Sequence, residues 1–328
     1  MQPNCRGITV MENENVTETG GFLAAFADGV IWVLQSFFLG FYNILYAITH
    51  PGSWLDWLSW ANTTEDKESL MRFVYYGGST EFFFAVLAVV VTVIGFGIWR
   101  NTFMWGCVRV LEGIANGVGR LFAWAGLLMV LQQIIIVFMQ RIFTRPDISI
   151  GFGIPLQFDI SWFAEELKLY NAIVVCLCVT YTFVQGGHVR VDLVYAAVSH
   201  RAKRVIDMFG SLFFMVPTAT IVWLYGWYFL WRHLITPNPA ASYDLERLLR
   251  TSRAVRWSVE TIGFSPNGFN GYFLFKILLV TFAGMVFLQG IAFFMRSFLE
   301  WREGEESVGK YISRDSLGEG EEAYEGTH

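Results

Sequence analysis

The chain is poor in charged residues and in proline. Asp, Glu, Lys and Arg make up only 16% of its 328 residues, whereas 54% are hydrophobic and 17% are aromatic. So much apolar surface exceeds what one soluble core can bury, which excludes an ordinary soluble domain and indicates a protein solvated by lipid. Of the eight prolines, only Pro217 falls inside a long apolar run, so no proline breaks a helix in the other runs.

Residues that carry catalytic or metal chemistry are also scarce. The four cysteines suggest no disulfide framework, and Cys176 and Cys178 lie two apart on a helix, on nearly opposite faces, so they cannot chelate one ion together. None of the five scattered histidines has a second ligand three or four residues away. The sequence has no serine elbow, paired catalytic carboxylates or cofactor fingerprint. We therefore expect no metal site, no cofactor and no enzymatic activity.

The stretch Gly304-Glu305-Glu306-Ser307-Val308-Gly309-Lys310-Tyr311 almost spells a phosphate-binding loop. Tyr311 replaces the Ser or Thr that would hold magnesium, no strand precedes the stretch, and its carboxylates would repel phosphate. We interpret the likeness as chance.

Six apolar runs are long enough to cross a bilayer, since about 20 helical residues span roughly 30 Å of hydrocarbon. The runs are Phe22–Thr49, Phe82–Trp99, Leu121–Phe143, Leu167–Val184, Val205–Trp231 and Tyr272–Met295. Runs this continuous do not fit the alternating strands of a barrel. The sequence therefore predicts an all-α, polytopic helical membrane protein with about six transmembrane helices.

Lys and Arg in the short connections predict the orientation, because cytoplasmic loops carry an excess of both. The richer connections hold Arg100, Arg109, Arg120, Arg190, Arg201, Lys203 and Arg204, and the sparser ones hold Lys67, Arg72 and Arg145. This difference places both termini in the cytoplasm. The connection 232–271 goes against it, with Arg247, Arg250, Arg253 and Arg256 on the predicted outer side. Long loops, however, translocate with little regard for charge.

Several segments outside the runs have patterns of their own. Val108–Arg120 and Tyr243–Thr261 carry polar residues at spacings of three and four, which predicts amphipathic helices along the membrane surface. The Trp-rich stretch Trp54–Trp60 suits the headgroup zone, with a surface interaction site as the alternative. Met1–Gly20 lacks a basic segment before an apolar core, so we expect the first run to be a retained anchor.

The runs themselves contain few ionisable residues. Asp28 lies about two turns into the first run, whereas Asp207 and Lys276 lie near the starts of the last two, within reach of the interface by snorkelling. A self-sufficient transporter usually shows charges at mid-membrane or helices broken by Gly and Pro. We therefore expect a membrane subunit whose polar faces meet another protein.

Motifs at the ends of the predicted spans occur in a particular order. They are Gln140-Arg141-Ile142-Phe143, Phe163-Ala164-Glu165-Glu166-Leu167, Gly187-His188-Val189-Arg190-Val191-Asp192 and Ser265-Pro266-Asn267-Gly268, followed by Lys276 and Gln289. This series resembles the small membrane subunit (DctQ type) of tripartite ATP-independent periplasmic transporters, the TRAP transporters. Phe163 departs from the family, which usually has Trp there. The resemblance covers roughly Gly117 to Glu300.

The resemblance implies a division of the chain into three parts. Residues 117–300 correspond to a DctQ-like four-helix membrane domain, and residues 1–116 form an N-terminal extension with two further transmembrane helices. From Glu300 onward the chain has nine acidic and three basic residues. We expect the tail 301–328 to be disordered and solvated, with an acidic docking tail as the alternative.

The resemblance also implies a function. The chain would be a multi-pass scaffolding subunit of the bacterial inner membrane that makes no known chemistry. Its partners would be membrane lipids, a large sodium-coupled permease subunit and a periplasmic solute-binding receptor, with no nucleic acid. The assembly would import an organic acid, commonly a carboxylate. A self-sufficient six-span transporter or channel is the alternative, and a membrane-embedded enzyme is a more distant one.

The motif residues are the candidates for subunit contacts or for structural roles. They are Arg141, Glu165, Glu166, His188, Arg190, Asp192 and Lys276. Arg190 and Asp192 lie two apart in a short connection beside the bilayer, where they can meet a partner or cap helix ends. An ordinary polar turn that obeys the positive-inside tendency is the alternative reading of this connection.

The topology is open to a labelling test. In a background without native cysteines, single cysteines at Ser199 and Thr63 should react differently with an impermeant reagent in intact cells. Position 63 should be labelled from the periplasm and position 199 should not, because only position 199 lies on the side rich in Lys and Arg. Labelling of position 199 from outside would reverse the predicted orientation.

Overall fold

Six long helical segments build the protein. The computed structural model describes residues 22–151, 155–186, 198–261 and 268–312, and these contain six helices long and apolar enough to cross a membrane. They are α1 (Phe22–Thr49), α4 (Thr80–Trp99), α5 (Asn101–Val137), α6 (Ile160–Gln185), the continuous pair α8 (His200–Gly210) and α9 (Val216–Arg232), and α11 (Phe273–Glu303). The prediction of an all-α polytopic membrane protein is confirmed.

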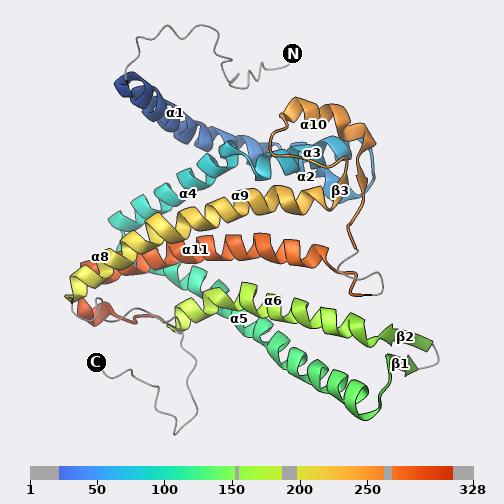
Figure 1. Cartoon of the computed structure of the whole chain (residues 1–328). Helices are drawn as coiled ribbons and strands as arrows, with labels where there is room; N and C mark the ends of the chain where they lie inside the picture. The colour runs from blue at the N-terminus through green and yellow to red at the C-terminus, as the bar shows by residue number, and fades with distance from the viewer. Residues whose placement is uncertain (1–21, 152–154, 187–197, 262–267, 313–328) are drawn as a thin grey trace.

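The long helices alternate in direction, so their connections gather at two ends of the bundle (Figure 1). We call one the cap end, which holds the described parts of residues 50–79, 143–159 and 233–272. The other is the tail end, which holds the α4–α5 corner, the start of α8 and residues 304–312. The start of α1 and the end of α11 both lie at the tail end (Figure 1). Because the first and last long helices begin and end on the same side, the chain crosses between the two ends an even number of times.

Helix α5 differs from the prediction that Val108–Arg120 is a separate surface helix. It runs unbroken for 37 residues and continues through a π turn at Phe138–Ile142. At 1.5 Å per residue, α5 is about 55 Å long, well beyond the hydrocarbon thickness. The polar positions Glu112 and Asn116 are buried inside the protein. No proline interrupts the segment, and its polar side chains find partners on other helices, so the helix continues into the third span.

The predicted surface helix Tyr243–Thr261 is also largely wrong. Only α10 (Leu245–Thr251) and a 3-10 turn at Ser252–Ala254 are helical. Val255 is buried, and the next two residues form strand β4 (Arg256–Trp257), which pairs antiparallel with β3 (Ile235–Thr236). Packing against the end of α9 therefore overrides the helical periodicity of the local sequence.

The cap end contains a helix that the sequence analysis treated as a loop. After α2 (Gly52–Leu55) and a 3-10 turn at Asp56–Ser59 comes α3 (Thr64–Gly77). The side chain of Thr63 accepts a hydrogen bond from the Asp66 amide, and Asp66 accepts one from the amide of Thr63. This capping box satisfies backbone donors that the first turn of a helix leaves unpaired.

Aromatic residues of α9 complete the other end of α3. The indole N–H of Trp227 donates to the carbonyl of Val74 at 2.8 Å, and that of Trp223 donates to the carbonyl of Gly77 at 3.0 Å. Both bonds satisfy carbonyls in the last turn of α3, which have no partner within the helix. An aromatic cluster surrounds the contact, formed by Trp54, Trp57, Trp60, Phe73, Trp223, Trp227, Trp231 and Trp257. The Trp-rich stretch thus packs within the cap.

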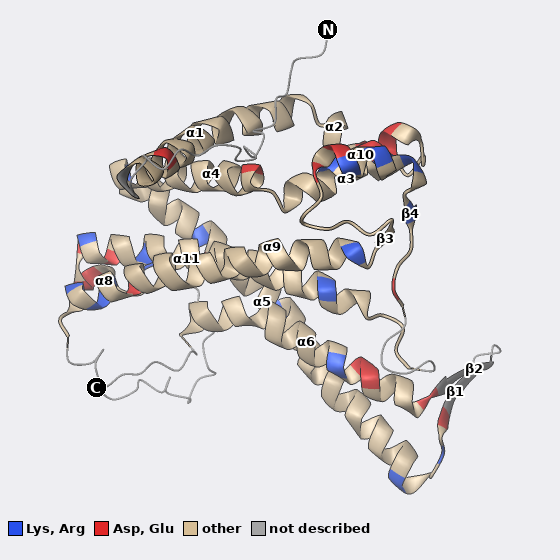
Figure 2. Ribbon diagram, turned by 45° about the horizontal axis from the view of Figure 1, so that its top comes forward, with Lys and Arg blue, Asp and Glu red and all other residues tan. Residues whose placement is uncertain are grey.

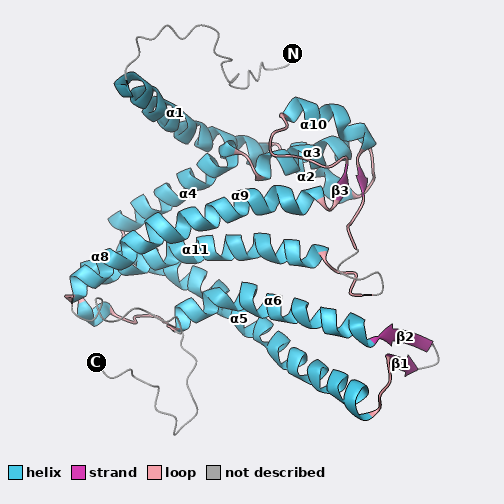
Figure 3. Ribbon diagram, in the orientation of Figure 1, coloured by secondary structure: helices cyan, strands magenta, loops and turns pink. Residues whose placement is uncertain are grey.

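Strands are few among the described residues, and all lie at the cap end (Figure 3). Besides β3 and β4, strands β1 (Asp147–Gly151) and β2 (Pro155–Asp159) form an antiparallel hairpin between α5 and α6. At the tail end, α6 stops at Gly186, whose φ of +76° belongs to the left-handed region that glycine adopts without steric cost.

Candidate functional site: polar junctions at the two ends of the bundle

Glu165 joins the beginning of α6 to the beginning of α11. Asp159 caps α6, since its side chain accepts a hydrogen bond from the Ser161 amide at 2.9 Å. Just over one turn further, Oε2 of Glu165 accepts from the backbone N–H of Phe269 at 2.9 Å. A Cβ atom on Gly268 would fall inside the Glu165 carboxylate, so only glycine allows this approach. Two of the motifs that carry the family resemblance therefore meet in one contact.

Glu166 makes a separate contact between α5 and α6. Gln132 donates from Nε2 to Oε2 of Glu166 at 2.8 Å, and the same nitrogen donates to the carbonyl of Phe163 at 3.3 Å. Tyr170 donates from its hydroxyl to Oε1 of Glu166 at 3.2 Å. A charged acceptor with two neutral donors is a strong link inside an apolar helix pair. Gln132 thereby joins α5 to α6.

Lys276 lies at the start of α11 and pairs with Glu260. His233, at the end of α9, lies with Nε2 3.4 Å from Oε2 of the same carboxylate. The hydrogen bond from Lys276, more than any other contact, holds the pKa of Glu260 below its usual range. Lys276 also lies over the ring of Phe229 at 5.2 Å, so its charge is shared between a carboxylate and an aromatic face.

The remaining candidates lie elsewhere. Arg141 is exposed in the π turn at the end of α5. His188, Arg190 and Asp192 fall outside the described residues. The described candidates Arg141, Glu165, Glu166 and Lys276 all lie toward the cap end. The other three candidates fall in the sequence between α6 and α8, and α6 ends and α8 begins at the tail end (Figure 1). The candidates therefore belong to several junctions rather than to one shared pocket.

A group of buried charges at the tail end was not among the residues that the motifs single out. They form what we call the ionic junction, made of Glu112, Arg204, Asp207, Arg296 and Glu300. Figure 2 shows charged residues gathered at the tail end around α8 and the end of α11. Arg296 donates from Nε and Nη2 to the two carboxylate oxygens of Glu112, each at 2.5 Å. This two-pronged pairing is the geometry that favours arginine over lysine.

Glu300 extends the ionic junction to α8. It lies 3.4 Å from Nη1 of Arg296 and 2.8 Å from Nη2 of Arg204, and Arg204 in turn pairs with Asp207 at 3.2 Å. Glu112, Arg296 and Glu300 are at most 8% exposed at their side chains. Unpaired charges would be strongly destabilising at such burial. The ionic junction thus holds α5, α8 and α11 together.

The ionic junction adds buried charges at the ends of the predicted runs to the few ionisable residues expected inside them. Asp207 was expected to reach the interface, but it is 9% exposed and paired. Arg296 lies just beyond the predicted end of the sixth span at Met295, and Glu112 was assigned to a surface helix. Two spacings in the sequence could have indicated this junction. Arg296 and Glu300 lie four residues apart, and Arg204 and Asp207 lie three apart. Each spacing places two opposite charges on one helix face.

The stretch that resembles a phosphate-binding loop folds back onto the ionic junction. Gly304 and Gly309 adopt φ values of +89° and +75°, and the carbonyl of Lys310 accepts a hydrogen bond from Nη1 of Arg296 at 3.1 Å. The ring of Tyr311 lies 5.6 Å from that of Trp105 in an edge-on arrangement. The glycines therefore serve to turn the chain. This part of the predicted tail is ordered, and residues 313–328 lie outside the described residues.

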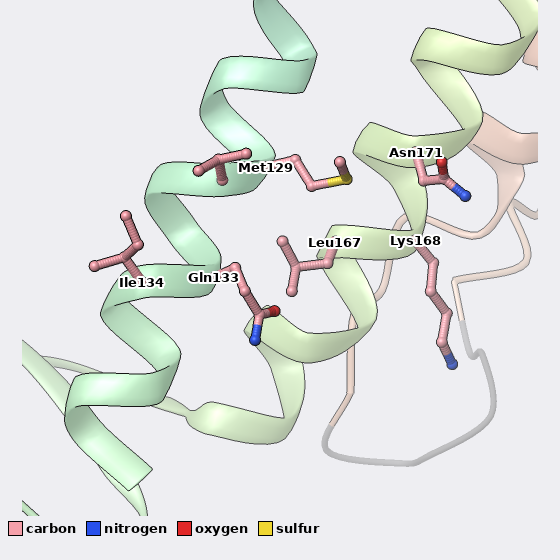
Figure 4. Close-up of a pocket in the computed structure, with 7 residues that line it drawn as sticks. Met129, Gln133, Ile134, Leu167, Lys168 and Asn171 are labelled. Atoms are coloured by element: carbon pink, nitrogen blue, oxygen red, sulfur yellow. The ribbon is translucent and has the colours of Figure 1, made fainter. Parts of the chain in front are cut away.

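A shallow cavity of about 520 Å³ lies between α5 and α6. In Figure 4, Met129 and Leu167 point into the space between the two helices, and Lys168 points away along α6. The lining also includes Val130, Gln133, Ile134 and Asn171. It contains a single ionisable side chain, Lys168, so it offers neither a carboxylate pair nor a nucleophile with an adjacent base. Within the described residues, no group of His, Cys, Asp and Glu could hold a metal ion.

The fold and its junctions define the class of the protein as a multi-pass α-helical membrane protein. Residues 134–242 match the family model of tripartite ATP-independent periplasmic transporters, DctQ component. The matched residues run from the last part of α5 through α6, α8 and α9 to the approach to α10. The match confirms the resemblance to the small membrane subunit, and this family is a transporter component rather than an enzyme. No curated protein and no solved structure matches the chain.

The Glu165 contact makes a prediction about Gly268. We expect Gly268→Ala to destabilise the fold by about 1–3 kcal/mol, because its Cβ atom would displace the carboxylate from the Phe269 amide. Gly113→Ala is the matched control, since a Cβ atom there meets nothing within 4 Å. The free energy of unfolding in detergent measures both. Equal effects of the two substitutions would contradict the role of the contact.

The ionic junction makes a second prediction. Arg296→Ala should cost about 3–5 kcal/mol of unfolding free energy, because it leaves Glu112 buried without its partner. Replacing both partners, as Glu112→Leu with Arg296→Met, should recover most of this loss, since Glu300 keeps Arg204. Arg250→Ala, at an 81% exposed side chain, should change stability by less than about 0.5 kcal/mol. A double variant no more stable than Arg296→Ala would refute the pairing.

Proposed function

We propose that the chain is the small, scaffolding membrane subunit of a tripartite transporter that imports an organic acid. The observation that carries the proposal is the match of residues 134–242 to the DctQ component, which covers two of the six long helical segments, α6 and the pair α8 and α9, together with the end of α5. Members of that family work with a large permease subunit and a solute-binding protein. We assign the same two partners to this chain, and membrane lipids as its surroundings.

The polar contacts support a static rather than a moving role. At the cap end, Glu165, Glu166 and Lys276 each link a long helix to a neighbouring segment, and at the tail end the ionic junction holds three helices together. Breaking such buried pairs costs several kcal/mol, so helices joined this way do not slide readily. A rigid bundle suits a subunit that braces the fixed part of a larger permease while the mobile part carries the substrate.

The finer features of the function follow the same analogy. In the proposed assembly the large subunit couples transport to sodium, and a periplasmic receptor delivers a substrate that is a carboxylate. The proposed location is the bacterial inner membrane, with the tail end and both termini in the cytoplasm. The connection with His188, Arg190 and Asp192 then faces the cytoplasm, where it would contact the large subunit. Arg141 and Lys276 would lie near the periplasmic side.

The N-terminal extension has a structural role in this proposal. Helix α3 lies within residues 1–116, and it packs on α9 and α10, which belong to the proposed four-helix domain 117–300. The two parts therefore share one aromatic core at the cap end. We propose that the extension stiffens the small subunit and enlarges its surface in the membrane.

A reconstitution experiment tests the proposed function. In liposomes, the chain alone should give no sodium-dependent uptake of any organic acid, because its long apolar runs contain few ionisable residues. Uptake should appear when the large subunit and the liganded receptor are added, and it should fall sharply when this chain is left out. Uptake by the chain alone would favour a self-sufficient transporter, and full uptake without it would end the scaffold proposal.

A further inference from the structure

Helix α1 lies at the edge of the bundle and packs on α4 (Figure 1). Gly40 marks the contact, because a Cβ atom there would lie 2.7 Å from the carbonyl oxygen of Phe84. Trp32 meets the ring of Phe84 edge-on at 5.4 Å. Gly40 is also the only buried residue among those of α1 whose side chains are described. Most of α1 is therefore exposed on the surface of this chain and faces lipid or another protein.

The exposed side of α1 has a regular polar pattern. Asp28, Gln35, Tyr42 and Thr49 follow one another at intervals of seven residues, and all four are exposed. Residues seven apart lie close to one line along a helix, so these four form a single stripe. We call it the α1 stripe. A large apolar residue follows three positions after each of Asp28, Gln35 and Tyr42. These residues are Ile31, Phe38 and Leu45, which are 51%, 68% and 64% exposed.

The α1 stripe points away from α4. Gly40 lies five residues from both Gln35 and Leu45, which corresponds to a rotation of about 140° around the helix. A shallow groove of about 530 Å³ follows the stripe, lined by Ile31, Leu34, Gln35, Phe38, Leu39 and Tyr42. In a seven-residue repeat, the first and fourth positions form the seam along which one helix packs against another. The α1 stripe and the apolar residues three positions after its members occupy these two positions.

Lipid alone is a poor neighbour for this face. Gln35 is the fourteenth residue of the 28-residue α1, about 20 Å from its beginning, so a glutamine side chain cannot reach either headgroup zone. An amide in hydrocarbon leaves its hydrogen-bonding groups unsatisfied, whereas a neighbouring helix can satisfy them. Asp28, nearer the beginning of α1, would leave a charge in the same apolar layer.

A second copy of the chain does not fit either. Two copies in one membrane lie parallel, and the same positions of a parallel helix pair face each other. The two Asp28 carboxylates would then meet across the contact, where like charges repel. A different helix that places a cation or a hydrogen-bond donor opposite Asp28, and an amide or hydroxyl opposite Gln35, satisfies both groups.

We propose that the α1 stripe is a docking surface for a transmembrane helix of the large permease subunit. The inference rests on the proposed function for the identity of the partner. It lies outside residues 134–242, so it adds a contact surface that the matched part of the chain does not contain. The N-terminal extension thereby contributes directly to assembly, besides its packing at the cap end.

Crosslinking within the purified complex tests this surface. The photoreactive residue p-benzoylphenylalanine in place of Phe38 should crosslink to the large subunit, because Phe38 lies on the stripe and is 68% exposed. The control is the same residue in place of Val33, which is 45% exposed and lies about 7.5 Å along the helix on another face. The control should give at least about fivefold less of this product. A product between two copies of the chain, or a product with lipid only, would overturn the inference.

Substitutions give an independent test. Gln35→Leu should lower the amount of large subunit that co-purifies about threefold, and Asp28→Leu with Gln35→Leu about tenfold, because each removes one interhelical polar contact. Val33→Leu is the control and should leave recovery unchanged. The thermal stability of the isolated chain should not fall in any of these variants, since Asp28, Val33 and Gln35 are exposed on its surface. Unchanged recovery with Gln35→Leu and the double variant would refute the proposed surface.

The same experiments separate this inference from the proposed function. If the unaltered chain does not co-purify with the large subunit at all, the proposed function fails. If it does co-purify but Phe38 gives no product with the large subunit, the proposed function stands and only the role of the α1 stripe is refuted.

Discussion

The guanidinium of Arg296, held between the carboxylates of Glu112 and Glu300, fixes how the long helices meet at the tail end. Charge in an apolar layer is tolerable only when it is paired and hydrogen-bonded, so each of these groups constrains the positions of the others. Because Glu300 also pairs with Arg204, the constraint passes from α5 through α11 to α8. The turn at Gly304 and Gly309 then closes over the same site through the carbonyl of Lys310.

The cap end uses different chemistry for the same purpose. Indole N–H groups of α9 complete the last turn of α3, and the aromatic rings around them fill the space between α3, α9 and α10. Nearby, Glu165 and Glu166 bind backbone and side-chain donors of neighbouring segments. Between these two ends the helices are largely apolar. The bundle is therefore joined firmly at both ends, while its middle offers mainly apolar side chains to its surroundings.

The sequence predicted the long helices well because hydrocarbon thickness imposes a length and a composition that are visible in single runs. It failed where a residue's partner is far away in the chain. Glu112 and Arg296 are separated by 184 positions, so the helical spacing around Glu112 indicated a surface helix when the true partner was another span. Likewise, Val255 and Trp257 belong to an aromatic core that includes Trp57, which no local pattern in Tyr243–Thr261 could indicate. The motifs made Glu165 and Glu166 candidates, but their contacts came only from the structure.

The bond between Trp227 and the carbonyl of Val74 joins residues 153 positions apart. A ribosome adding about 5–20 residues per second makes Trp227 roughly 8–30 s after Val74. During that interval α3 has left the ribosome with Leu70, Met71 and Val74 uncovered, and α4, α5 and α6 are made before α9 exists. The contact between α3 and α9 can thus close only after three long helices have been made, and the uncovered side of α3 needs protection from premature association until Trp227 has been made.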